Sequence, residues 1–206
     1  MVISPLPIRR NKNKLLQQFI RKNVVSIILA LFIGVLLFVP NAKAYLLKGL
    51  LSTGIFNAST KKESDTVNAA KPANLSFSDK NGNHINTNDL KGKIIFINFW
   101  ADWCPPCIAE MASINALYNK LKTDPRFVFV LADADNNLHQ AIAFMDKHQY
   151  DLPAYQIAGP IPTDLFSGSL PTTIIIDTKG HLVQRHEGIA NYDTKEMLEL
   201  LQSLLQ

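Results

Sequence analysis

The only two cysteines of this 206-residue chain lie three positions apart, in the segment Trp103-Cys104-Pro105-Pro106-Cys107. The apolar run that precedes them, residues 94–100, has the length and composition of a buried strand. Residues 108–122, which follow, have helical spacing with apolar side chains on one face. The pattern therefore predicts that the cysteines lie at a strand-to-helix junction, with Cys104 at or just before the first helical turn.

A helix N-terminus suits a reactive thiol. The first N–H groups of a helix have no helical partner, and the positive end of the helix dipole lies there, so a thiolate is stabilised. The two prolines fit the same position, because a first-turn proline lacks only an N–H that has no partner. We expect Cys104 to be the exposed nucleophile and Cys107, one turn later, to be the partly covered resolving thiol.

A C-x-x-C pair can instead bind a metal. Structural zinc needs four ligands, whereas this chain has no second cysteine pair and no histidine spacing that points at the first pair. The loop Asp133 to Asn137 also fails as a calcium loop, because Leu138 and Phe144 stand where glycine and glutamate are needed. We expect no metal and no cofactor other than a redox-active Cys104–Cys107 disulfide.

Residues 99–107 resemble the active-site segment of thioredoxin-fold proteins, especially the membrane-anchored, extracytoplasmic thiol–disulfide oxidoreductases of the TlpA/ResA type. Glu110 follows Cys107 by three residues, like the acid of that group's C-x-x-C-x-x-E pattern. Ser169 to Thr173 is similar to the family's cis-proline loop. The resemblance implies an α/β, thioredoxin-like fold over residues 75–206, with a central mixed sheet flanked by helices and an N-terminal hairpin.

The resemblance also implies roles for individual residues. Glu110 would relay the proton of the buried thiol, although the spacing alone also fits a solvated acid on the helix surface. Asn98 stands where thioredoxin has a buried aspartate, and an amide cannot act as a base. Proton handling is therefore assigned to Glu110.

Three further residues are expected to contact the substrate. Pro171 would be cis and face the disulfide, and Leu170 would offer backbone groups to an extended substrate. Trp103 would be an exposed apolar contact, whereas Trp100 would pack in the core.

The function implied is an enzyme that exchanges protein thiols and disulfides. We favour reduction of protein disulfides, either generally or in cytochrome c maturation, with electrons from a DsbD-like transmembrane donor. Three alternatives remain: a disulfide-donating oxidase or isomerase, a peroxidase, and a non-catalytic binding module with a structural disulfide. The peroxidase is disfavoured because Ala101 stands where a threonine would be needed.

The N-terminal part of the chain predicts membrane attachment. Residues 1–60 carry eight basic residues and no acid, while the remainder carries thirteen basic and seventeen acidic residues. This distribution argues against a nucleic-acid-binding fold, which would carry its basic patch on the folded domain. Residues 1–23 are expected to be a basic cytoplasmic arm, and 24–40 a single transmembrane anchor in the inner membrane that places the catalytic domain in the periplasm.

A cleaved signal sequence is the alternative to the anchor, because Ala42-Lys43-Ala44 resembles a cleavage site. Residues 41–74 are expected to be a juxtamembrane segment and flexible linker. Within the domain, residues 75–78 and 84–86 predict a hairpin. Further strands are expected at 127–132, 172–177 and 182–186, and helices at 138–148 and 191–205.

Overall fold

The computed structural model describes residues 23–26, 28–34, 49 and 74–205. The chain divides into two units, Met1–Lys43 and Ala44–Gln206. In the first unit, residues 23–26 and 28–34 are helical. Among the residues described, no helix has both the length and the apolar character needed to cross a membrane. Most of the predicted arm, part of the predicted anchor and nearly all of the predicted linker lie outside these residues.

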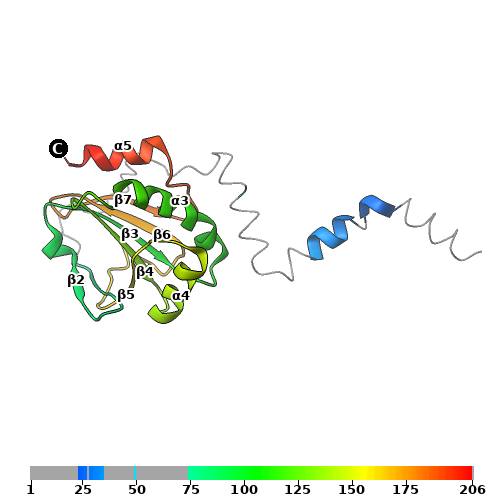
Figure 1. Cartoon of the computed structure of the whole chain (residues 1–206), viewed down its shortest axis with the longest axis horizontal. Helices are drawn as coiled ribbons and strands as arrows, with labels where there is room; N and C mark the ends of the chain where they lie inside the picture. Colours follow the sequence, from blue (N-terminus) through cyan, green and yellow to red (C-terminus); the bar gives the residue numbers. More distant parts are fainter. Residues whose placement is uncertain (1–22, 27, 35–48, 50–73, 206) are drawn as a thin grey trace, which may run out of the picture. The chain divides into compact units, whose positions relative to one another are not determined.

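The second unit is built on one mixed seven-stranded sheet, in the order β2-β1-β5-β4-β3-β6-β7 (Figure 1). The strands are β1 (Ser76–Ser78), β2 (His84–Asn86), β3 (Ile94–Trp100), β4 (Phe127–Asp133), β5 (Ala154–Ile157), β6 (Thr172–Ile176) and β7 (Leu182–Glu187). The helices are η1 (Thr87–Leu90), α3 (Pro105–Leu121), α4 (Leu138–His148) and α5 (Lys195–Ser203).

Strand β3 lies at the centre of the fold. It pairs in parallel with β4 and antiparallel with β6. Helix α3 connects β3 to β4, which confirms the predicted strand–helix–strand unit. The N-terminal hairpin of β1 and β2 is also present, and Gly82 adopts a positive φ of 79° in its turn.

The side chains of β3 alternate between two buried clusters. Ile94, Phe96 and Trp100 pack with residues of α3, α4 and α5. The alternate residues of β3 pack on the other face with Leu75 and Phe77, beside and within the hairpin. All seven residues of β3 are buried, as the continuous apolar run predicted.

The last helix begins later than its sequence pattern predicted. We expected it to start at Asn191, but α5 starts at Lys195, where the Thr194 hydroxyl accepts a hydrogen bond from the Met197 N–H. The residues before Thr194 instead contact α3, where the Tyr192 N–H donates to the Ser113 hydroxyl.

Candidate active site

The dithiol lies where β3 gives way to α3. Cys104 is the N-cap of α3, with an extended backbone (φ −84°, ψ 106°), and its sulfur accepts the Cys107 N–H at 3.3 Å. The two prolines occupy the first two helical positions, where no helical acceptor is available for an N–H. The predicted junction is therefore confirmed, and the sulfur of Cys104 lies in the field of the helix N-terminus.

Cys104 and Cys107 form a disulfide. Cys104 is only 3% exposed and Cys107 is fully buried. The expected exposure of Cys104 is therefore wrong in degree, although Cys104 remains the more accessible of the two. The reason is that both cysteines pack into the cluster on the α3 side of the sheet, against which Leu170 also lies.

The loop before β6 carries the predicted cis proline. The Leu170–Pro171 peptide bond is cis, and Pro171 is buried. The antiparallel register pairs Phe99 with Thr172, so the proline lies beside the end of β3 that leads to the cysteines. The sequence motif thus identified both segments that meet at the site.

Glu110 is completely buried, so the interpretation of it as a solvated surface acid is wrong. Its Oε1 accepts the Asn98 Nδ2–H at 2.8 Å, and its Oε2 accepts the Ala190 N–H at 3.1 Å. Burial raises its pKa from 4.5 to about 8, because desolvation outweighs the stabilisation of the carboxylate by these two donors. A carboxyl with such a pKa exchanges a proton readily near neutral pH.

A buried polar network continues from Glu110 across the sheet. Asn98 also donates to the Thr173 hydroxyl at 2.9 Å, and that hydroxyl accepts the Tyr192 O–H at 2.7 Å. Burial raises the pKa of Tyr192 well above its ordinary value, and the nearby charge of Glu110 adds to this effect. Sequence reasoning singled out Asn98 only as a departure from thioredoxin and did not find Thr173 or Tyr192 as members of the site.

The two tryptophans separate as predicted. Trp103 is 63% exposed, and its indole N–H donates to the carboxylate of Asp135. Trp100 is fully buried and packs against Phe144, with ring centroids 5.1 Å apart. Asp135 belongs to the loop before α4, in which Asn137 caps the helix by accepting the Gln140 N–H.

Within the part of the chain that the structure describes, no group of three or more histidine, cysteine, aspartate or glutamate side chains could hold a metal ion. The reactive groups that the structure brings together are the dithiol and the buried acid, with hydrogen-bond donors around the acid. These groups can accept electrons and a proton together, because the disulfide gains two electrons when it opens and the resulting thiolates bind protons.

Relatives of the chain carry names that agree with this chemistry. Residues 62–201 match the Redoxin family. The chain is 36% identical over 127 residues to the thiol-disulfide oxidoreductase ResA of a Bacillus cereus strain, a match that covers 61% of this chain and 71% of the relative. It is 35% identical over 141 residues to ResA of Bacillus thuringiensis subsp. konkukian, covering 68% and 79%.

Solved structures show the same fold. A thiol:disulfide interchange protein of the thioredoxin family from Chlorobium tepidum TLS superposes with a TM-score of 0.53 at 21% identity, covering 66% of this chain and 99% of the other. A secreted thiol-disulfide isomerase from Corynebacterium glutamicum gives 0.51 at 20% identity, covering 65% and 84%. The chain belongs to the Redoxin family, and within it to the thioredoxin-like thiol–disulfide oxidoreductases of the TlpA/ResA type.

Proposed function

We propose that this enzyme reduces disulfides of protein substrates outside the cytoplasm, with Cys104 as the nucleophile. The observation that carries the proposal is the Cys104–Cys107 disulfide at the N-terminus of α3, one helical turn before a fully buried acid. The relatives named ResA support a thiol–disulfide exchange reaction. The choice of the reducing direction, and of cytochrome c maturation or general thiol reduction as the setting, follows the resemblance to the TlpA/ResA group.

The reaction would proceed by two exchange steps. The Cys104 thiolate attacks one sulfur of the substrate disulfide, which breaks, and a mixed disulfide forms while the leaving substrate thiolate takes up a proton. Cys107 then attacks the sulfur of Cys104, so the internal disulfide closes and the second substrate thiolate leaves. The substrate gains two electrons and two protons, and the enzyme dithiol is oxidised. No other cofactor is needed for this cycle.

Glu110 would take the proton that Cys107 loses in the second step. It follows Cys107 by three residues on the same helix, and both side chains are fully buried. A buried thiol does not ionise readily without an acceptor, since its thiolate is poorly solvated there. A carboxylate with a pKa of about 8 is matched to this transfer near neutral pH.

Trp103, Leu170 and Pro171 would form the substrate contact surface. Trp103 offers an exposed ring next to Cys104, and the cis-proline loop lies beside the end of β3. Leu170 would offer its backbone groups to an extended substrate segment. Such main-chain contacts give affinity with little dependence on the substrate sequence, as in strand addition.

The location and the electron supply are also proposals. Residues 24–40 would anchor the protein in the inner membrane, with residues 1–23 in the cytoplasm and the catalytic domain in the periplasm. A reductase in an oxidising compartment needs electrons from across the membrane, and a DsbD-like protein is the kind of donor that fits.

The direction of the reaction can be tested by the redox equilibrium of the purified protein in a dithiol buffer, read by alkylation of Cys104 and Cys107. A reduction potential near or below roughly −270 mV supports a reductase that must be supplied with electrons. A potential near roughly −120 mV would make the protein a disulfide donor instead. A protein without any two-electron transition, or one that fails to reduce insulin disulfides, would be a binding module.

A further inference from the structure

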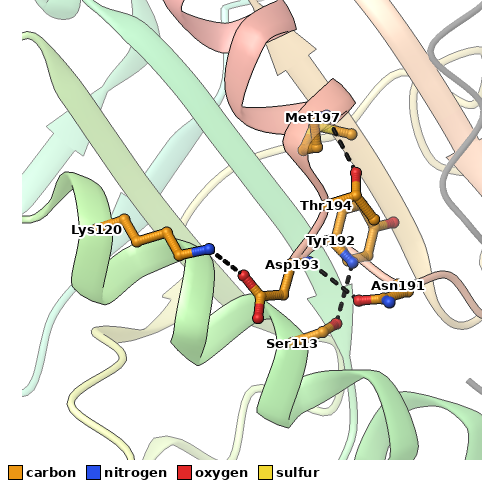
Figure 2. A network of polar contacts seen from close by, with 7 residues as sticks. All are labelled: Ser113, Lys120, Asn191, Tyr192, Asp193, Thr194 and Met197. Carbon is orange, nitrogen blue, oxygen red and sulfur yellow. Dashed lines mark hydrogen bonds and ion pairs between the residues drawn. The ribbon is translucent and has the colours of Figure 1, made fainter. Parts of the chain in front are cut away.

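The segment between β7 and α5 covers the buried acid. Ala190 donates its N–H to Glu110 Oε2 at 3.1 Å. Two residues later, the Tyr192 N–H donates to the hydroxyl of Ser113 at 3.1 Å (Figure 2). That hydroxyl donates in turn to the Glu110 carbonyl at 2.7 Å. The segment is therefore held on α3 at the same helical turn that carries Glu110.

The side chain of Tyr192 returns to Glu110 by a second route. Its hydroxyl contacts Thr173 on β6, Thr173 contacts Asn98 on β3, and Asn98 contacts the Glu110 carboxyl, at 2.7, 2.9 and 2.8 Å. Each of these side chains is at most 2% exposed. Water therefore cannot readily replace any side chain in this series of hydrogen bonds. The orientation of each group depends on its neighbours.

The Asn98 amide has two possible orientations with opposite effects on Glu110. As found, its NH₂ group faces both Glu110 and Thr173, while Oδ1 is buried without a hydrogen-bond partner in the structure. Rotation by 180° would place Oδ1 against the carboxyl, where it would repel a carboxylate and accept a hydrogen bond from the O–H of the neutral acid. The Thr173 oxygen favours the observed orientation, because it accepts the second N–H of the amide.

We propose that Thr173 and Tyr192 are positioning residues for the exchange reaction, which hold the Asn98 amide with its NH₂ group toward Glu110. The proposal rests on the proposed role of Glu110 as the proton acceptor of Cys107. Tyr192 acts through Thr173: without the phenol, the threonine hydroxyl loses one partner and can turn its own hydrogen toward the amide oxygen. Both residues therefore favour the ionised form of Glu110.

The pKa of Glu110 depends on groups from several elements that pack around it. Burial raises its pKa, whereas the Ala190 N–H and the Asn98 amide lower it. The titratable groups near the network are Tyr192 and the two cysteines, which are oxidised here, together with His186 of β7, which pairs with Thr173 across the sheet. Measurement on the oxidised protein removes the thiols from the titration.

The test is a titration of the full-length oxidised protein in detergent, labelled with ¹³C at the glutamate carboxyl. The chain has five glutamates, so the Glu110 signal can be assigned by its loss in Glu110→Gln. In Thr173→Val we expect the Glu110 midpoint to rise by about one pH unit, since one net hydrogen bond to the charged form is lost. Tyr192→Phe is expected to shift it in the same direction by about half as much.

Two matched variants should leave the midpoint unchanged. Thr173→Ser keeps the hydroxyl, and Tyr118→Phe removes a phenol from α3 that is not part of the network. If the Glu110 titration midpoint were unchanged in both Thr173→Val and Tyr192→Phe, the inference would be wrong. If Thr173→Val does not fold, the midpoint in Tyr192→Phe is the test by itself.

The pH profile of insulin reduction separates this inference from the proposed function. If the Glu110 midpoint and the rate profile both shift upward in Thr173→Val, the positioning role in the reaction is supported. If the midpoint shifts while the rate profile stays in place, the role of Glu110 as proton acceptor is wrong, and with it the positioning role in the reaction, even though the enzyme still exchanges disulfides.

Discussion

The two sides of the disulfide differ sharply. Beneath it lies a dry polar network whose members are fully or almost fully buried, namely Asn98, Glu110, Thr173 and Tyr192. Beside it lies an exposed rim, where Trp103 contacts Asp135. Burial raises the pKa of the interior acid, Glu110, to about 8. In the proposed mechanism, the interior of this site handles protons, whereas the rim contacts substrates.

Removal of the buried acid should give the largest effect on the reaction. Glu110→Gln should slow resolution of the mixed disulfide by about a hundred-fold near neutral pH, the typical contribution of a positioned proton acceptor. The rate should also lose its inflection near the Glu110 pKa of about 8. Stopped-flow measurement of the second exchange step across pH checks both expectations.

Glu196→Gln is the matched control, because Glu196 is an exposed acid in the first turn of α5. Its rate should remain within about twofold of the parent protein, since surface charges contribute little. If Glu110→Gln had the parent's rate at every pH, the Glu110 carboxyl would have no part in the mechanism. The interior of the site would then have no proton-handling role to set it apart from the rim.

The buried acid should also set how stability depends on pH. The pKa of Glu110 is raised in the folded state, from 4.5 to about 8, so the folded protein holds a proton that the unfolded chain has lost between these values. The free energy of unfolding should therefore fall by several kcal/mol as pH rises through this window. In Glu110→Gln this decline should be absent.

Chemical denaturation of the oxidised protein, at about pH 5 and about pH 9, measures this difference. The comparison must use the change with pH in each variant, because glutamine has one acceptor oxygen and cannot accept from both the Asn98 amide and the Ala190 N–H, which destabilises the fold at every pH. Parallel pH dependence in the two proteins would contradict the raised pKa of Glu110.

The rim should give the smallest effects. Trp103→Ala should change the free energy of unfolding by less than about 0.5 kcal/mol, because the ring is mostly exposed. It should raise KM for a protein disulfide by about fivefold, equivalent to about 1 kcal/mol of lost apolar contact. Steady-state insulin reduction measures KM and kcat separately.

Trp100→Ala sharpens the same comparison, since Trp100 differs from Trp103 chiefly in burial. Loss of this core ring should cost about 3 to 5 kcal/mol of stability. Equal destabilisation by Trp103→Ala would contradict the difference in burial between the two rings. An unchanged KM in Trp103→Ala would mean that the rim is not a substrate surface.

The sequence predicted those parts of the molecule that local patterns determine. The bounds of β3 and α4 were predicted correctly, because a continuous apolar run and a helical period are each contained in one segment. The cis proline was also confirmed, although it was predicted from a motif.

The buried network could not be predicted in this way, because its contacts join distant residues. Asn98 and Thr173 are 75 positions apart, and Glu110 and Ala190 are 80 apart. Tyr192 was assigned to the last helix, whose apolar spacing extends into the segment that covers Glu110. Thr194 was the available signal for the true start, because threonine is a favoured N-cap residue.

The proposed order of attack is that Cys104 attacks the substrate and Cys107 then resolves the intermediate. It is tested by mixing the reduced Cys107→Ser and Cys104→Ser variants with oxidised insulin and separating the products by non-reducing electrophoresis. Cys107→Ser should accumulate a thiol-sensitive mixed disulfide, because the resolving step is blocked, while Cys104→Ser should trap none. Trapping by Cys104→Ser alone, or by neither variant, would contradict the assigned order of attack.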